Sequence, residues 1–206
     1  MKVLSQSFYN RPSVVEIAME LIGKIICTSF NGGLTTARIV ETEAYNGVMD
    51  KASHAFGGRN TARTSVMFGE PGHAYVYLCY GIHHLFNVVT NKPGTPHAVL
   101  VRAVEPIKGI EIMLERTGKA RPDFTLTRGP GNVSKALGIN SGHTGLGLFK
   151  SPMWIADDKL EIASSSIIAT PRIGVDYAAE DAALPYRFFL ENNKYVSGNR
   201  RQNQPY

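Results

Sequence analysis

Runs of β-branched and aromatic residues that face each other across short turns constrain the fold of this chain most. The runs KIICTSF and LTTARIVETEAY flank the turn NGG, and HAYVYLCYGIHHLFNVVT holds two more runs with a turn near Gly81. Both patterns are typical of β-hairpins. MWIADDKLEIAS predicts a third hairpin, and AVLVRAVEP, IIATPRIGV and PYRFFL predict further strands. Because hairpins join antiparallel strands, the sheet is expected to be mostly antiparallel.

The helical segments are few and do not alternate regularly with the strands. In SVVEIAMELIGK, Ser13 and Glu16 fit a capping box and Gly23 can end the helix. PIKGIEIMLERTG predicts a second helix that ends at Gly118, and RGPGNVSKALGI predicts a glycine-rich turn followed by a short helix. The sequence therefore predicts an α+β fold: one mixed domain with a curved, mostly antiparallel sheet, flanking helices and a protruding β-hairpin.

Length and composition predict one domain over residues 1–206, because no linker or shift of composition divides the 206 residues. The cationic tail NRRQNQPY, about residues 199–206, is expected to be mobile. No apolar stretch approaches the roughly 20 residues of a membrane helix, and the first residues lack the apolar core of a signal peptide. Cys27 and Cys79 suit a reduced compartment. We therefore expect a cytoplasmic protein without membrane contact, associated with the nucleoid if the source is bacterial.

The net charge of +5, with a sequence pI near 9.2, favours a polyanionic partner such as nucleic acid but does not require one. The segment RGPGN at residues 128–132 could point backbone N–H groups at a phosphate of such a polymer. A plain turn is an equally good interpretation of the same residues.

Two carboxylates, Glu41 and Glu43, follow an apolar run in the segment IVETEAYN. The period of a strand would place both on one face with Tyr45. Three interpretations stay open at this point: a solvated strand end, an acid/base site, or a metal site that also uses Asp50 and His54. The spacing of these four residues matches no compact metal motif.

Two further residues are unusual for their positions in the sequence. Arg102 interrupts the apolar run AVLVRAVEP, where an unpaired charge would be costly, so a carboxylate or a phosphate is expected beside it. Tyr80 falls at the predicted turn of the second hairpin, where it would be exposed and could act as a wedge between stacked bases. Tyr75, on the same hairpin, is expected to pack with its hydroxyl satisfied.

The blocks RIVETEAYNG, ASHAFGGRNTART, MFGEPGHAYVYLCYGIHHLFNVVT, VLVRAVEP, RGPGNVSKALGI and PRIGVDYA occur in an order and spacing that resemble the alkyladenine (3-methyladenine) DNA glycosylase family. The resemblance covers roughly residues 8–200. It implies a general base at Glu43, with Arg102 near the catalytic water and a nucleotide phosphate. It also implies a base pocket formed by Tyr45, His54, Tyr77, Asn87 and Val175, and it implies that Tyr80 fills the gap in the duplex. Independently, the cations Arg59 and Arg63 are expected beside the DNA backbone, where they would position the duplex without reading its sequence.

The activity that this resemblance implies is that of a monofunctional DNA glycosylase of base excision repair. Such an enzyme would flip 3-methyladenine, 7-methylguanine and, in some members, hypoxanthine or ethenoadenine out of the duplex. A water activated by Glu43 would then hydrolyse the N-glycosidic bond and leave an abasic site. The resemblance implies no metal and no organic cofactor, a monomer, and damaged double-stranded DNA as the partner.

Two rival functions use the same residues differently. A non-catalytic protein could recognise distorted duplex through its basic surface and a Tyr80 wedge. A metal-dependent hydrolase could instead use the four candidate ligands, which are Glu41, Glu43, Asp50 and His54. An anion beside DNA is unfavourable for binding alone but favourable for stabilising positive charge on a sugar, so the carboxylates favour the glycosylase.

Overall fold

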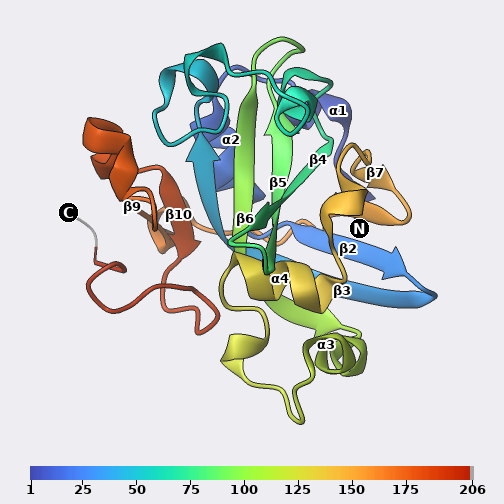
Figure 1. Cartoon of the computed structure of the whole chain (residues 1–206). Helices are drawn as coiled ribbons and strands as arrows, with labels where there is room; N and C mark the ends of the chain where they lie inside the picture. The colour runs from blue at the N-terminus through green and yellow to red at the C-terminus, as the bar shows by residue number, and fades with distance from the viewer. Residues whose placement is uncertain (205–206) are drawn as a thin grey trace.

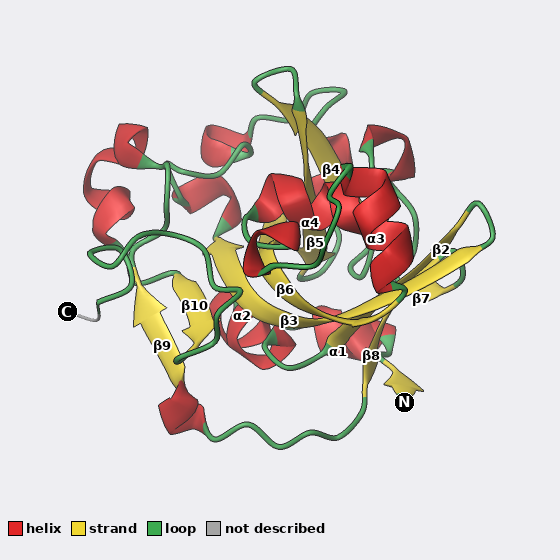
Figure 2. Cartoon of the chain, turned by 90° about the horizontal axis from the view of Figure 1, so that it is seen from below, coloured by secondary structure: helices red, strands yellow, loops and turns green. Residues whose placement is uncertain are grey.

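The computed structural model describes residues 1–204, which build one curved antiparallel sheet with helices on both of its faces (Figures 1 and 2). The main path of the sheet runs in the order β1 (Lys2–Val3), β8 (Met153–Asp157), β2 (Ile25–Phe30), β3 (Gly33–Tyr45), β6 (His97–Lys108), β5 (His83–Thr90) and β4 (Ala74–Cys79). Off this path, β10 (Arg187–Leu190) pairs with β3 and with β9 (Ile167–Thr170), and β7 (Phe149–Lys150) pairs with β8. The predicted α+β class and both of the first two hairpins are confirmed.

The helices lie where the capping signals predict them. Beside the short α1 (Gln6–Tyr9), the chain forms α2 (Val14–Leu21), α3 (Ile110–Thr117) and α4 (Pro130–Leu137). The Ser13 side chain accepts a hydrogen bond from the backbone of Glu16 at the start of α2. α3 ends at Gly118, which has the left-handed φ of 74° that glycine adopts without strain. Short 3₁₀ turns complete the set: η1 (Gly47–Met49), η2 (Phe56–Gly58), η3 (Ser65–Phe68), η4 (Phe124–Leu126), η5 (Ser141–His143), η6 (Ser164–Ser166) and η7 (Asp176–Ala183).

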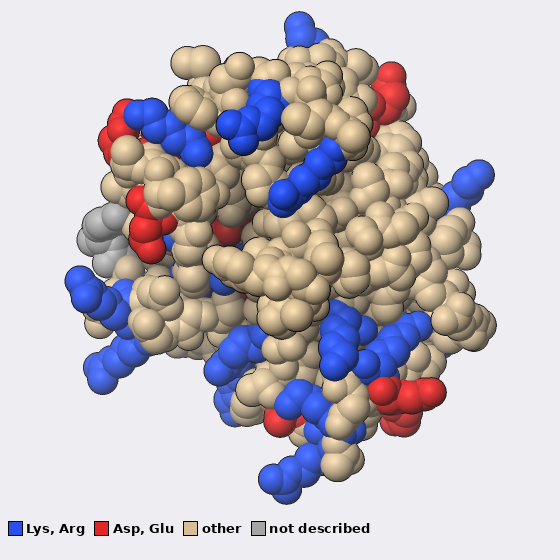
Figure 3. All heavy atoms as spheres, in the orientation of Figure 1, with Lys and Arg blue, Asp and Glu red and all other residues tan. Residues whose placement is uncertain are grey.

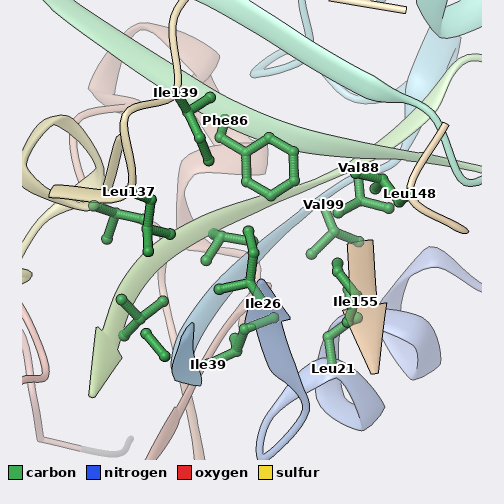
Figure 4. Packing of buried hydrophobic residues seen from close by; sticks show 14 of the residues in the cluster. Leu21, Ile26, Ile39, Phe86, Val88, Val99, Leu137, Ile139, Leu148 and Ile155 are labelled. Carbon is green, nitrogen blue, oxygen red and sulfur yellow. The ribbon is translucent and has the colours of Figure 1, made fainter. Parts of the chain in front are cut away.

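The core lies where the curved sheet meets these helices. Figure 2 shows α3 and α4 on one side of the curve of β2, β3 and β6, and α1 and α2 on the other. Figure 4 shows buried side chains of the sheet and of the helices packed together, among them Leu21, Ile26, Ile39, Phe86 and Leu137. Burying one such side chain contributes about 1.5–3 kcal/mol. This packing fixes the strand ends that carry the polar residues discussed below.

β3 is the longest strand and lies inside the sheet for its whole second half. It pairs with β6 along most of its length, and β10 joins its other edge opposite residues 41–43. Register shifts against β6 between Ile39 and Glu41, and between Glu41 and Thr42, interrupt the strict alternation expected from sequence. Both glutamates are therefore enclosed by neighbouring strands, and the interpretation as a solvated strand end is wrong.

The third predicted hairpin, over residues 153–164, is wrong. β8 forms as expected, but the residues after Asp157 leave the sheet as a loop that leads to η6. The side chain of Asp157 accepts a hydrogen bond from the backbone of Lys159, which has a φ of 65°. This local turn uses backbone groups that a return strand would need. β8 finds its partners in β1, β2 and β7 instead.

The C-terminal tail folds back onto β10 at residues 202 and 203. The carbonyl of Gln202 and the side chain of Asn203 accept hydrogen bonds from Arg187. Mobility of the tail over 199–206 stays a prediction, and residues 205 and 206 lie outside the described residues. Within residues 1–204, no helix has the length and apolar character needed to cross a membrane.

Candidate active site

A cavity of about 380 Å³ opens where the end of β3 meets the β4–β5 hairpin, the loop before η3 and the segment around Val175. Its volume is within the range of small-molecule pockets. Figure 3 shows a hollow left of the centre of this face, with charged side-chain atoms at depth. The cavity is lined by most of the predicted site residues, namely Tyr45, His54, Arg63, Tyr77, Tyr80, Asn87, Arg102 and Val175.

Aromatic rings form one wall of the cavity. The rings of His54 and Tyr77 meet edge to face with centroids 4.5 Å apart, and those of Tyr75 and Tyr77 are 5.5 Å apart at 34°. The hydroxyl of Tyr75 is hydrogen-bonded to Nδ1 of His54 at 2.7 Å, which confirms the prediction that Tyr75 packs with its hydroxyl satisfied. Rings fixed in this way offer π faces to a flat ligand.

His54 is neutral at physiological pH. Burial, together with the neighbouring positive charges of Arg63 and Arg59, lowers the pKa of His54 from 6.5 to about 4. Arg63 also lies over the Tyr77 ring at 4.9 Å, with its Nη2 3.4 Å from Nε2 of His54. Near pH 7 this imidazole can accept or donate a hydrogen bond, but it does not supply a positive charge.

This pKa predicts a pH dependence of stability. Because the folded-state pKa of His54 is below its unfolded value, the unfolded state binds more protons between about pH 4 and pH 6.5. The free energy of unfolding should therefore fall as the pH is lowered through this window, and His54→Gln should remove part of the fall. Urea unfolding of both proteins from pH 4 to 7.5 measures the difference, and an imidazole that titrates near 6.5 by NMR would contradict the assignment.

The two carboxylates of β3 are fully buried and have different partners. Glu43 accepts hydrogen bonds from the Tyr45 hydroxyl at 2.8 Å and from the backbone N–H of Ile173 at 2.8 Å. Its Oε1 also lies 3.1 Å from Nη1 of Arg102. All three partners line the cavity, so Glu43 lies directly behind the lining without being part of it.

Glu41 has one partner in the cavity lining, Arg102. Its Oε1 lies 2.6 Å from Nε of Arg187 and 3.1 Å from Nε of Arg102. Its Oε2 accepts the backbone N–H of Ser197 at 2.7 Å. Its partners Arg187 and Ser197 lie outside the cavity lining, so Glu41 is a structural neighbour of the site that is paired with arginines.

Arg102 joins the two carboxylates, so a carboxylate is the partner that its position in an apolar run predicts. Burial alone would lower the pKa of Arg102, but the carboxylates of Glu43 and Glu41 outweigh it and raise that pKa. The guanidinium therefore remains a permanent cation at the edge of the cavity.

The metal interpretation fails on the donor set. Asp50 is bound through both of its oxygens to the buried guanidinium of Arg172, and Glu41 and Glu43 face other arginines. An arginine guanidinium is already paired with each of these three carboxylates. In the part of the chain that the structure describes, no three His, Cys, Asp or Glu side chains come together in a metal-binding group.

Tyr80 stands at the tip of the β4–β5 hairpin with 91% of its surface exposed, beside the mouth of the cavity. The N–H of Ile82 bonds to the carbonyl of Cys79, and both central residues of this turn, Tyr80 and Gly81, have positive φ. A tyrosine is strained at such a position. The predicted exposure of an aromatic residue at this turn is confirmed.

The remaining predicted residues fall into two groups. Asn87 and Val175 are buried in the lining, where the Asn87 amide donates to the carbonyls of Tyr75 and Leu85. Arg59 is exposed and is not part of the lining, in contrast to Arg63.

Sequence reasoning missed two contributions from the segment PRIGVDYA. Arg172 lies over the Tyr45 ring at 4.9 Å while it holds Asp50, and Tyr177 lines the cavity and donates to the carbonyl of Ala52. An arginine among the mostly apolar residues of IIATPRIGV was the available signal, but its partner lies 122 residues away in sequence.

Comparison with known proteins identifies the family. The family model described as "Methylpurine-DNA glycosylase (MPG)" matches residues 7–194. A protein of Desulfitobacterium hafniense named "Putative 3-methyladenine DNA glycosylase" is 44% identical over 204 residues, which covers 96% of this chain and 99% of that protein. A protein of Methanocella arvoryzae with the same name is 47% identical over 197 residues, with 96% of each chain covered.

These matches agree with the site: a cavity with tyrosine faces, a buried carboxylate bonded to its lining and an exposed aromatic residue at its mouth suit the excision of a base. They also confirm the resemblance that the sequence blocks indicate. The chain belongs to the methylpurine-DNA glycosylase family, enzymes that hydrolyse N-glycosidic bonds in the repair of alkylated DNA.

Proposed function

We propose that this protein flips alkylated purines out of duplex DNA and releases them with a water molecule activated by Glu43. The observation that carries the proposal is the Glu43 carboxylate directly behind the lining of the tyrosine-walled cavity, where it is hydrogen-bonded to Tyr45 and lies next to Arg102, both of which line the cavity. The product would be free base and an abasic site. Duplex DNA that contains damaged purines would be the partner of a monomeric enzyme.

The chemistry asks for one anion near the sugar. Departure of the base builds positive charge on the deoxyribose, which a carboxylate stabilises, and the same carboxylate can take a proton from the attacking water. Glu43 suits this task because burial strengthens its field and its partners hold its orientation. We assign Arg102 to the water and the phosphate of the flipped nucleotide, and the carbonyl of Val175 to the same water.

Selection of the base would depend on charge and fit. Alkylation of a ring nitrogen makes a purine cationic, so the electron-rich faces of Tyr45 and Tyr77 would favour 3-methyladenine and 7-methylguanine. Asn87 would crowd the exocyclic amino group of normal guanine. Hypoxanthine and ethenoadenine are neutral, and for these bases His54 would act by hydrogen bonding, because its low pKa removes the option of a proton at neutral pH.

No lysine belongs to the cavity lining, as far as the described residues extend. A lysine nucleophile would be needed for a Schiff base with the sugar and for strand cleavage. The proposed enzyme therefore stops at the abasic site.

Tyr80 would fill the gap that the flipped nucleotide leaves, with Arg59 and Arg63 as neighbours of the backbone. Base–aromatic stacking is worth about 1–3 kcal/mol. Tyr80→Ala should therefore weaken binding to a duplex with an abasic site by about tenfold or more, while Tyr80→Phe stays near wild type. Fluorescence anisotropy measures the affinity of both variants, and equal affinities of wild type and Tyr80→Ala would contradict the proposed role of Tyr80.

An assay of defined lesions tests the proposal. Duplexes that each carry one of the four lesions are incubated with the protein in excess, with and without chelator, and abasic sites are then cleaved by alkali. We expect release of 3-methyladenine and 7-methylguanine at the same rate in chelator, and intact strands before the alkali step. Survival of every lesion would refute the proposal, and loss of activity in chelator would restore the metal-dependent rival.

A further inference from the structure

The Arg102 guanidinium is held along two of its edges. Nη1 lies 3.1 Å from Oε1 of Glu43, while Nε lies 3.1 Å from Oε1 of Glu41. Both Nε and Nη2 donate to the hydroxyl of Ser197 at 3.3 Å. A planar group bound in this way has one orientation, and that orientation presents a single nitrogen to Glu43.

Glu41 is itself fixed by the same segment. The hydroxyl of Ser197 donates to its Oε1 at 2.9 Å, and the backbone N–H of Ser197 donates to its Oε2 at 2.7 Å. The Nε of Arg187 adds a third contact at 2.6 Å. Because both oxygens are engaged, the carboxylate cannot turn away from Arg102.

Arg187 anchors this arrangement in the interior. It is fully buried, and its guanidinium donates to four further groups: the hydroxyl of Thr170, the carbonyls of Ser197 and Gln202, and the side chain of Asn203. Three of these four residues lie beyond position 194, where the match to the family model ends. The segment 197–203 thus ties the back of the site to β9 and β10.

A guanidinium left free beside a buried carboxylate would close on it with two parallel hydrogen bonds, which is the strongest geometry for this pair. Oε1 of Glu43 already faces Ile173 and Arg102, and Oε2 accepts from Tyr45, so a second bond from Arg102 to Oε2 would take the acceptor site that remains for water. The contacts from Glu41 and Ser197 hold the Nε edge of Arg102 and oppose this closure.

We propose that Glu41, Arg187 and Ser197 are positioning residues that keep Arg102 turned so that the Glu43 carboxylate remains available to water. The inference rests on the proposed role of Glu43 as the general base. It assigns a task in base release to the segment after residue 194, whose described residues 195–204 contribute nothing to the cavity lining.

Ser197→Ala tests this inference because it removes the bridging hydroxyl and leaves both charges in place. We expect single-turnover base release from a 7-methylguanine duplex to slow about three- to tenfold, the size of effect typical of one ordinary hydrogen bond. The dissociation constant for the duplex should stay within about twofold. Ser197→Thr keeps the hydroxyl and should restore release.

Thr28→Val is the matched control. Thr28 is a fully buried residue of β2 whose hydroxyl also has two partners, Thr35 and the carbonyl of Leu137, and it lies outside the cavity lining. The Thr28→Val substitution should lower the unfolding midpoint and leave the rate of base release within about twofold of wild type.

Three results would overturn the inference: wild-type release by Ser197→Ala, equal slowing by Thr28→Val at the same loss of stability, or no recovery in a normally folded Ser197→Thr. Glu43→Gln, measured in parallel, separates the two levels. If Glu43→Gln is inactive while Ser197→Ala is normal, only the positioning role fails. If Glu43→Gln releases the base normally, the proposed function fails first.

Discussion

Glu43→Gln is expected to lower single-turnover base release by about 10²–10⁴-fold, the range typical of general acid–base catalysis. The substitution keeps the shape of the side chain and an oxygen that can accept from Tyr45 or Ile173. It removes the negative charge that takes the proton and that faces the sugar. Affinity for damaged duplex should be equal or higher, because an anion no longer faces the phosphates.

The release rate is measured with enzyme in excess by quenching samples over time, cleaving abasic sites with alkali and separating the strands on a gel. Fluorescence anisotropy on the same duplex gives the affinity. Glu43→Asp serves as a second variant, because it retains the charge but moves it back by one methylene. It should fall between wild type and Glu43→Gln in rate. Equal release by wild type and Glu43→Gln would exclude the carboxylate as the base.

Glu41→Ala is expected to destabilise the fold by about 3–5 kcal/mol, since it leaves the buried guanidinium of Arg187 without its carboxylate. For a chain of this size such a loss lowers the melting temperature by roughly 10 °C. Urea unfolding and calorimetry measure the two quantities. A loss below about 1 kcal/mol would show that the buried pair is not needed for the fold.

Asp158→Ala provides the matched control for Glu41→Ala, because it also truncates a carboxylate to a methyl group. Asp158 forms an equally short ion pair with Arg38, at 2.7 Å, but both side chains are partly exposed. Solvent screens such a pair, so the expected loss is at most about 1 kcal/mol. The contrast between the two variants isolates burial as the cause.

The sequence predicted the sheet well where turn chemistry and strand composition agree. Tyr80 and Gly81 at the tip of the second hairpin form the expected turn, and the strand composition of β4 and β5 fits its pairing. The prediction failed at residues 153–164, where the pattern of a strand was present but the aspartates bind local backbone. A local hydrogen bond to a turn is not visible in hydrophobic periodicity.

The candidate site was predicted as a set of residues but not as a network. Arg102, Tyr80 and the pair Glu41 and Glu43 could be singled out because each conflicts with its local surroundings: a charge in an apolar run or an aromatic residue at a turn. The choice of Glu43 within the pair came from the family resemblance. Arg187 and Ser197 could not be found in this way, because their partner Glu41 lies 146 and 156 residues away. Only the fold brings them together.

In the proposed mechanism, Glu43 activates the water that cleaves the N-glycosidic bond of a base that has already left the stack. A duplex with 2-aminopurine beside a 7-methylguanine tests it most directly, because the fluorescence of 2-aminopurine rises when its neighbour unstacks. In stopped-flow experiments with quenched samples in parallel, Glu43→Gln should show the extrusion phase of the wild type and no release of 7-methylguanine. Release at the wild-type rate, or the absence of an extrusion phase from both proteins, would contradict the mechanism.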